Sequence, residues 1–261
     1  MSAKAATMQE VNPMVQTRAI RAQATGAHTT AKQPVCEACS LRTACLSSGL
    51  PKGALKELDS AVMSSRRLRL GQALYRSGEP FQAVYLVRSG FVKTVVLLED
   101  GREQVTGLHM PGEMLGMDGI ARGRHASDAI ALGDSDICVI PYDRLEHLEQ
   151  GAGAVQRMLH RMFSCEIVRE QQMMLLLGSM RAEERVAVFL LNLSERFTAL
   201  GFSPSEFVLR MTREEIGSLL GMKLETVSRT LSRFQRDGLI EVEGRHVRIV
   251  SAAGLRGILA H

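Results

Sequence analysis

The sequence predicts an α+β fold in which a strand-rich part is followed by a long helix and a mostly helical C-terminal part. Short apolar stretches punctuated by Gly, Asp and Pro run from about 66 to 142, which is typical of a β-roll or barrel. Residues 151–180 carry a helical hydrophobic repeat instead. The last part, 182–261, has helical patterns and ends in two short strand candidates, GLIEVEG and RHVRIV.

The composition is that of a globular protein with an aliphatic core. The chain has 261 residues, enough for two ordinary domains, and contains no Trp, three Tyr and 14 Met, so aliphatic and thioether side chains must fill its interior. Its net charge of +4 is only a weak indication of an anionic partner. No apolar run approaches the roughly 20 residues of a membrane span, and the N-terminus lacks the apolar stretch of a secretory signal. We therefore expect a cytoplasmic protein.

The first 50 residues divide into a tail and a cysteine loop. Residues 1–34 are rich in Ala, Thr and Gln without a sustained helical or strand period, and we expect a flexible tail. The loop at 35–50 contains CEACSLRTAC, which holds Cys36, Cys39 and Cys45. An odd cysteine count in a reducing compartment disfavours a disulfide framework and favours metal binding or redox chemistry.

The residues alone leave the use of these thiols open. Thiolates suit either an iron–sulfur cluster or a closed tetrahedral zinc site, and the spacing matches neither common ferredoxin pattern. A thioredoxin-like redox dithiol is disfavoured, because no βαβ pattern surrounds Cys36. Cys165 is interpreted as a small buried hydrophobe on the long helix, and His28 as a tail residue rather than a ligand.

The strand-rich part, predicted over residues 51–150, begins with a short helical stretch at 52–65. Strand candidates follow as QALYRSG, AVYLVRSG and FVKTVVLLEDG, each ending in glycine. A hairpin turn is expected at Asp100-Gly101, because this pair readily adopts the positive φ angles that tight hairpin turns require. These features favour a roll of short strands.

A long helix is predicted over residues 151–181, and one stripe along it repeats at four-three spacing. We call this stripe the seam; its members are Phe163, Ile167, Glu170, Met174 and Leu177. The spacing predicts packing against a parallel partner helix, although a helix on its own domain's core would show it equally. In a parallel dimer, two Glu170 carboxylates about 6 Å apart would repel by roughly 3 kcal/mol at an effective dielectric near 20. We expect this repulsion to hold the metal-free form mainly monomeric.

The segment TREEIGSLLGMKLETVSRTLSRFQRDGLIEVEG, residues 212–244, predicts two helices joined by a tight turn. Thr212 and Glu215 form a capping box at the start of the first helix, and Gly221 supplies the turn. The second helix is expected over 224–236. Its buried face should consist of residues at i, i+4 and i+7, namely Val227, Leu231 and Phe234. With the strand pair that follows, the pattern predicts a winged helix-turn-helix.

The other side of the second helix carries side chains suited to DNA. Glu225, Ser228 and Arg229 lie near its N-terminal end, where a recognition helix presents side chains to base edges. Arg can donate two hydrogen bonds to guanine, and Glu can accept one from the cytosine amino group. The alternative is that Glu225 and Arg229 form only an exposed ion pair, worth about 0.3–0.5 kcal/mol. Further DNA contacts are predicted for Thr226, Arg213, Arg233, Arg236, Arg245 and Arg248.

Five motifs together resemble those of one protein family. They are C-x2-C-x5-C in the cysteine loop, EDGREQVTGLHMPGEMLGMDGI, DSDICVIP, RAEERVAVFLLNLSERF and LETVSR. With them the chain, from about residue 36 to 250, resembles the family of the cyclic-AMP receptor protein and the fumarate-and-nitrate-reduction regulator, and is closer to the second, oxygen-responsive branch. The resemblance implies a jelly roll of the cyclic-nucleotide-binding type, a dimerisation helix and a C-terminal DNA-binding domain over 182–261.

The resemblance also implies a cofactor and partners. In that branch three loop thiolates and one from the β-roll hold a [4Fe–4S] cluster, at positions matched here by Cys36, Cys39, Cys45 and Cys138. A homodimer formed at low oxygen would bind an inverted repeat of TTGAT and ATCAA, contact RNA polymerase through β-roll loops, and control anaerobic or microaerobic genes as activator or repressor. A regulator with structural zinc or a small ligand in the β-roll is the retained alternative.

Two other functions are disfavoured. Nucleotide-binding members of the family hold the cyclic phosphate with a Gly-Glu pair and an Arg-Ser or Arg-Thr step. Gly112-Glu113 is present, but His125-Ala126 stands at the second step, so the bidentate guanidinium and the hydroxyl are missing. An enzyme is not expected, because the chain has no Walker loop, GxGxxG or GxSxG. A cysteine-loop oxidoreductase is the remote alternative.

Overall fold

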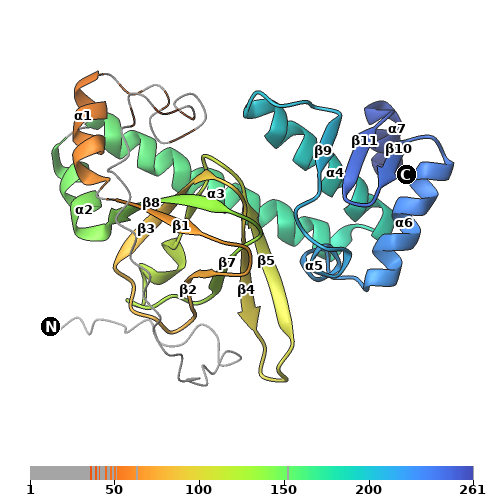
Figure 1. Ribbon diagram of the computed structural model, residues 1–261, viewed down its shortest axis with the longest axis horizontal. Helices are drawn as coiled ribbons and strands as arrows, with labels where there is room; N and C mark the ends of the chain where they lie inside the picture. The colour runs from red at the N-terminus through yellow and green to blue at the C-terminus, as the bar shows by residue number, and fades with distance from the viewer. Residues whose placement is uncertain are drawn as a thin grey trace, which may run out of the picture.

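The computed structural model describes residues 36, 39, 41, 45, 48, 50, 52–62, 64–151 and 153–260. The predicted tail, 1–34, and most of the predicted cysteine loop lie outside these residues. The described chain forms a β-roll, a long helix and a winged helix-turn-helix, so the predicted α+β fold is confirmed (Figure 1). Within the described ranges, no helix is long and apolar enough to cross a membrane.

The β-roll consists of two antiparallel four-stranded sheets. One has the strand order β1-β8-β3-β6 and the other β2-β7-β4-β5. Alternate residues of the strands point into the roll, and Val87 and Ile137 are completely buried there. The strands are β1 Ser64–Leu68, β2 Ala73–Tyr75, β3 Ala83–Ser89, β4 Val92–Leu97, β5 Glu103–His109, β6 Met114–Leu115, β7 Asp128–Ala131 and β8 Ser135–Pro141, with a short 3-10 helix, η2, at Met117–Gly119.

The hairpin between β4 and β5 confirms the predicted turn. Gly101 has a φ of 84°, a left-handed conformation that glycine adopts without strain. Its amide donates a hydrogen bond to the carbonyl of Leu98 at 3.0 Å, which closes the turn.

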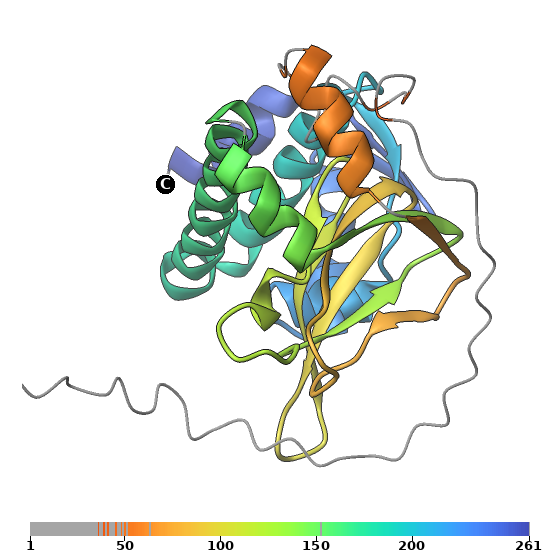
Figure 2. The ribbon, with the colours of Figure 1, turned by 90° about the vertical axis from the view of Figure 1, so that its left-hand side faces the viewer.

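Three helices lie against the roll: α1 (Lys52–Ala61), α2 (Tyr142–Gly151) and α3 (Gly153–Ser179). Figures 1 and 2 show α1, α2 and the start of α3 together at one end of the roll. The helical stretch predicted over 52–65 is too long, because Ser64 and Ser65 pair with β8 as the first residues of β1. Tertiary pairing therefore ends the helix earlier than the sequence pattern does.

The C-terminal part is a winged helix-turn-helix with a three-stranded sheet, β10-β11-β9. Its predicted core is confirmed, since Val227, Leu231 and Phe234 are all buried. The third strand, β9, was not predicted, because only three residues pair after the turn-rich sequence FSPS. The elements are α4 Ala182–Ala199, β9 Glu206–Val208, α5 Arg213–Leu219, α6 Leu224–Arg236, β10 Ile240–Glu243, β11 His246–Ile249, α7 Ala252–Gly257 and a final 3-10 helix, η3, at Ile258–Ala260.

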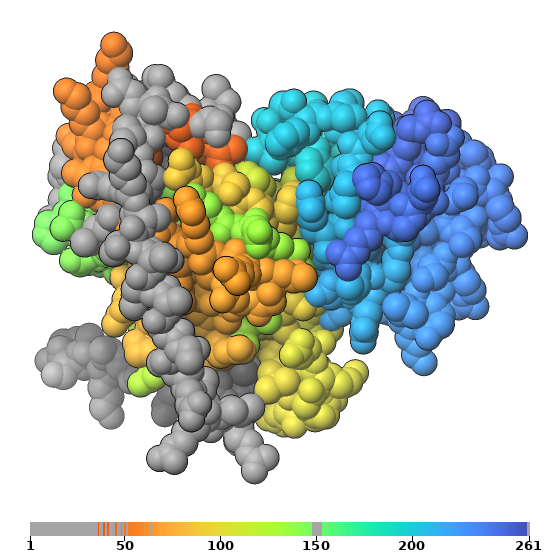
Figure 3. Space-filling model, in the orientation of Figure 1, coloured from red at the N-terminus to blue at the C-terminus, as the bar shows by residue number. Residues whose placement is uncertain are grey.

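The helix-turn-helix part rests directly on the roll. Ser218 of α5 receives a hydrogen bond from the amide of Val105 on β5 at 2.8 Å, and Gln104 donates to the carbonyl of Ser218. Figure 3 shows the surfaces of the β4–β5 hairpin and the helix-turn-helix part meeting. The covalent link between α3 and α4 is only Met180-Arg181. Contacts with the roll therefore add to this short link in setting how the C-terminal part is oriented.

Candidate DNA-binding surface and cysteine site

The helix-turn-helix is built by local sequence features of α5 and α6. The predicted capping box is confirmed: the amide of Thr212 donates to the Glu215 carboxylate at 2.6 Å, and the amide of Glu215 donates to the Thr212 hydroxyl at 3.1 Å. Gly221 has a φ of 63°, as the tight turn requires. Gly217 was missed by the sequence reasoning. A Cβ there would lie 2.6 Å from the carbonyl oxygen of Met222, so only glycine lets α5 and the turn approach so closely.

The N-terminal half of α6 presents the predicted base-reading side chains. Glu225 and Arg229 are exposed, whereas Ser228 and Thr226 are half-buried. Among the described residues no ion pair joins Glu225 to Arg229. The alternative of a simple exposed pair on this helix therefore receives no support, and both side chains point away from the core on the face opposite Phe234.

The predicted backbone-contacting arginines fall into two groups. Arg233 pairs with Glu183 and Asp237, and Arg248 pairs with its cross-strand neighbour Glu241. The carboxylate partners of these two guanidiniums would compete with DNA phosphates for them. Arg236 and Arg245 are exposed.

Arg213 differs from the other predicted DNA contacts. One of its nitrogens donates to the carbonyl of Gly244, in the turn between β10 and β11, at 3.0 Å. Burial lowers the pKa of this guanidinium. Arg213 thus joins α5 to the β10–β11 hairpin, which forms the wing. The sequence did not predict this structural contact.

Cys138 is placed by the alternation of β8. Its neighbour Ile137 points into the roll, so Cys138 points outward, toward α1, α2 and α3. It is 6% exposed and belongs to an apolar cluster that includes Leu58 and Leu159. Cys36 and Cys45 pack against the same cluster, and Cys39 acts electrostatically on Cys138. The structure therefore brings the four predicted ligand thiols into one region.

The electrostatics of this region oppose free thiolates. Burial raises the pKa of Cys138 to about 12, with the neighbouring Cys45 adding to the effect. Burial also raises the pKa of Cys36, whose amide donates to Asp59 of α1 at 2.6 Å. Ligation would therefore need a cationic group that offsets these costs. In the described part of the chain, no three His, Cys, Asp or Glu side chains are close enough to hold a single metal ion.

The interpretation of Cys165 as a buried hydrophobe is wrong. In the single chain Cys165 is exposed on α3. It lines a cleft of about 360 Å³ between α3, α4 and the loop that joins β5 to β6, and Cys45 lines the same cleft. The cleft wall is rich in thioethers, with Met110, Met114, Met117, Met158 and Met162. His28 lies outside the described residues.

The positions that hold a cyclic phosphate in nucleotide-binding proteins of this type are engaged within the chain. Asp118 accepts hydrogen bonds from the amides of Ala126 and Ser127 at 2.9 and 3.0 Å and lies 3.1 Å from Nδ1 of His125. Burial alone would raise the pKa of Asp118, but these hydrogen bonds lower it. A carboxylate of the chain itself thus takes the donors that an anionic ligand would need. Sequence reasoning missed Asp118, whose role no motif signals.

Comparison with known proteins agrees with this arrangement. The model of the Crp-like helix-turn-helix domain matches residues 184–258, and that of the cyclic nucleotide-binding domain matches 65–151. Fold and motif matches define a DNA-binding transcription regulator, and the chain belongs to the CRP/FNR family, whose members are regulators rather than enzymes.

Several relatives span nearly the whole chain. The transcriptional activator protein Anr of Pseudomonas aeruginosa is 44% identical, covering 85% of this chain and 91% of its own length. The fumarate and nitrate reduction regulatory protein of Escherichia coli is 39% identical, over 87% of this chain and 90% of its own. The solved structure of FixK2 from Bradyrhizobium japonicum matches with a TM-score of 0.68 and 32% identity, covering 75% of this chain and 96% of that one.

Proposed function

We propose that this regulator senses oxygen through a [4Fe–4S] cluster held by Cys36, Cys39, Cys45 and Cys138. The observation that carries the proposal is the position of Cys138, buried on the outer face of β8 beside the thiols of the N-terminal loop. Four cysteine thiolates are the usual ligands of such a cluster. The names of relatives such as the fumarate and nitrate reduction regulatory protein point the same way.

The residues present fit such a group. The apolar cluster around Cys138 limits access of water, and Arg88 lowers the pKa of Cys138 against the larger effect of burial. When bound, the cluster would supply iron–sulfide chemistry that oxygen degrades. The chain's part is to tie the cysteine loop to β8, so that gain or loss of the group changes how the loop packs against α1 and α3.

Dimerisation is proposed to occur through the seam on α3. Ile167, Met174 and Leu177 are 59%, 67% and 37% exposed, so apolar side chains of this helix lack cover in the single chain. Glu170 is exposed among them. Phe163 is half-buried against the cluster around Cys138 and so contacts its own domain. Regulators of this family dimerise, and the proposed dimer would bury this stripe against its copy.

The proposed dimer reads an inverted repeat resembling TTGAT and ATCAA with the N-terminal half of each α6. Glu225, Ser228 and Arg229 are assigned to base edges. Phosphate contacts are assigned to Arg233, Arg236, Arg245 and Arg248, and Thr226 and Arg213 are further DNA contacts of the same proposal. RNA polymerase would contact loops of the β-roll, and the controlled genes would serve anaerobic or microaerobic growth. The domain boundaries at 34, 50, 150 and 181 are part of the same proposal.

Anaerobic purification followed by iron and acid-labile sulfide analysis tests the cofactor. The wild type should be brown and contain iron and sulfide in equal amounts. Cys138→Ser should lose both, whereas Cys165→Ser, which removes the exposed thiol outside the ligand set, should keep both. A colourless wild-type protein that holds zinc would overturn the proposal and favour a regulator with a structural metal.

A further inference from the structure

Glu113 lies at a junction of three parts of the molecule. Its carboxylate receives Arg196 of α4 in a two-point contact, with Nη2 at 2.7 Å and Nε at 3.0 Å. Arg169 of α3 approaches the same carboxylate at 3.4 Å. The amide of Met110, in the turn after β5, donates to it at 2.9 Å. The roll, the long helix and the helix-turn-helix part thus meet on one side chain.

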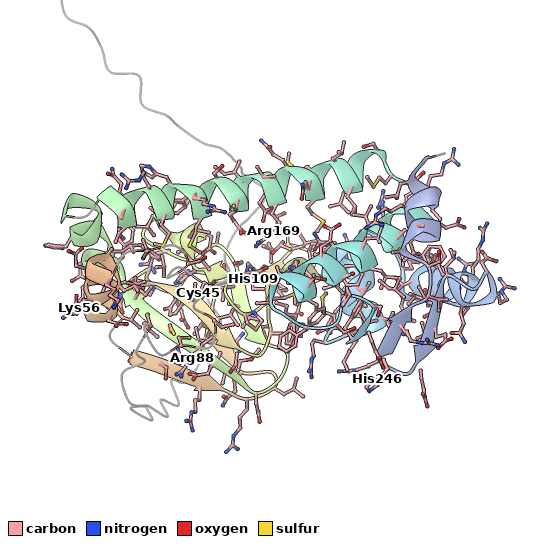
Figure 4. All side chains as sticks on the ribbon, turned by 90° about the horizontal axis from the view of Figure 1, so that it is seen from above. Cys45, Lys56, Arg88, His109, Arg169 and His246 are labelled. Atoms are coloured by element: carbon pink, nitrogen blue, oxygen red, sulfur yellow. The ribbon has the colours of Figure 1, made fainter. Side chains whose placement is uncertain are left out.

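This junction is largely shielded from water. The side chains of Glu113 and Arg196 are 15% and 18% exposed, and that of Arg169 is 35% exposed. Arg196 also donates to the carbonyl of Leu108 at 2.6 Å, which fixes its guanidinium against the end of β5. A planar guanidinium held at two points allows little rotation, unlike a single charged contact. In Figure 4, Arg169 and His109 are labelled at this end of the roll, beneath α3.

The junction matters because α3 and α4 are joined by only two residues, Met180 and Arg181. In the proposed dimer the two-fold axis runs between the two α3 helices. The recognition helix α6 packs against α4. Any rotation of α4 about that short link changes the separation of the two α6 helices. A dimer must present these helices to half-sites about one helical turn apart.

We propose that Glu113 and Arg196 are positioning residues for DNA binding, which hold α4 at the angle to α3 that sets the half-site spacing accepted by the dimer. The inference rests on the proposed dimeric function. Arg169 supports the carboxylate from the dimer helix with a longer contact. All three side chains lie at this junction and not on α6, so in this proposal they act on spacing selectivity and leave recognition of a single half-site to α6.

The test compares DNA spacers rather than overall affinity. Full-length protein, loaded anaerobically, is titrated with the inverted repeat at its native spacer, with the spacer lengthened by two bases, and with one half-site alone. The wild type should prefer the native spacer by at least about tenfold, because simultaneous binding of both half-sites is lost when the geometry does not fit. If the wild type shows no such preference, the proposed dimeric function fails, whatever the variants do.

The informative variant is the double substitution Glu113→Gln with Arg196→Met. Removing both of these buried partners leaves neither charge unpaired, and Arg169 keeps its 2.7 Å pair with Glu166, which limits any loss of folding. Its affinities for the native and the lengthened spacer should differ by no more than about threefold. Its affinity for the single half-site should stay within about twofold of the wild-type value. Arg196→Lys, which keeps the charge and loses the two-point contact, should show an intermediate preference.

Arg76→Gln provides the matched control. It breaks the 2.9 Å ion pair between Arg76 and Asp128, two residues that both belong to the roll. This variant should keep the wild-type spacer preference. An unchanged preference in the double variant would overturn the inference, and so would an equal loss on the half-site and on both spacers, since that pattern indicates general loss of the folded domain.

Discussion

The side-chain nitrogen of Lys93 lies 2.7 Å from a carboxylate oxygen of Glu215, joining β4 of the roll to the first helix of the helix-turn-helix. Both side chains are mostly buried, at 13% and 20% exposure. Glu215 also accepts from the amide of Thr212 at the start of α5. One carboxylate therefore serves both the cap of a helix and the contact between two parts of the molecule.

Lys93→Met should weaken this contact and destabilise the protein by about 1–3 kcal/mol, because a hydrogen bond to a charged group is lost and Glu215 is left with one partner fewer. Urea denaturation of the metal-free protein measures the change. Lys52→Met, at an exposed position of α1, is the control and should change stability by less than about 0.5 kcal/mol. Equal effects of the two substitutions would contradict the assigned role of Lys93.

The same carboxylate predicts a response to acid. Burial would raise the pKa of Glu215, but the hydrogen bonds from Lys93 and Thr212 lower it below the ordinary value of 4.5. The stability that this group contributes is therefore present above pH 4.5 and is lost as the pH falls through the lower, folded-state pKa. Below pH 4.5, the Lys93→Met variant should lose less stability than the wild type.

His109 should make the stability of the protein depend on pH in a second, higher range. It is buried beside Glu113, and burial lowers its pKa from 6.5 to about 4. The folded state therefore keeps the ring neutral, while the unfolded chain takes up a proton below pH 6.5. The free energy of unfolding should therefore be independent of this group above pH 6.5, and should fall by about 3 kcal/mol as the pH drops to 4.

Denaturation curves of the metal-free protein between pH 7.5 and 5 measure this slope. His109→Gln should flatten it, whereas His160→Gln, at an exposed position of α3, should retain it. If His109→Gln follows the wild-type slope throughout, the neutral buried ring is not its source.

On α6, Arg229→Ala should cost about 1–3 kcal/mol at one base position and relax selectivity there. Arg236→Ala, at an exposed position further along the same helix, should weaken all sequences alike and reduce the salt dependence of binding. Binding to operators with single-base changes at several salt concentrations separates the two patterns. A uniform loss from Arg229→Ala would place that residue at a phosphate.

On α3, Glu170→Ala should strengthen dimerisation of the metal-free protein by up to about a hundredfold, because it removes the repulsion between paired carboxylates. Analytical ultracentrifugation in air measures the dissociation constant. Glu195→Ala removes an exposed carboxylate from α4 and should leave the constant unchanged. A Glu170→Ala protein that stays monomeric, while the anaerobic wild type dimerises, would contradict the charge explanation.

Local features of the sequence predicted much of the helix-turn-helix. The cap formed by Thr212 and Glu215 and the turn at Gly221 depend on residues within a few positions of one another, and the structure confirms both. The buried face of α6 follows from its helical period. Such short-range signals are readable because a single element determines them.

Long-range contacts were not readable in this way. The sequence showed Glu113 only as part of the Gly-Glu pair that nucleotide-binding members use, whereas its partners Arg169 and Arg196 lie 56 and 83 positions away in the sequence. The exposure of Cys165 and the end of α1 also depend on how separate elements pack. Only the three-dimensional arrangement shows that Glu113 of the Gly-Glu pair binds two arginines of the same chain.

The most direct test of the account follows iron content and DNA affinity in the same samples. Anaerobic protein, protein exposed to air for increasing times, and anaerobic Cys138→Ser are each assayed for iron, sulfide and binding to the inverted repeat. Tight binding should decline in proportion to the iron lost, and Cys138→Ser should bind weakly from the start. Equally tight binding by iron-free protein prepared without air would contradict the account.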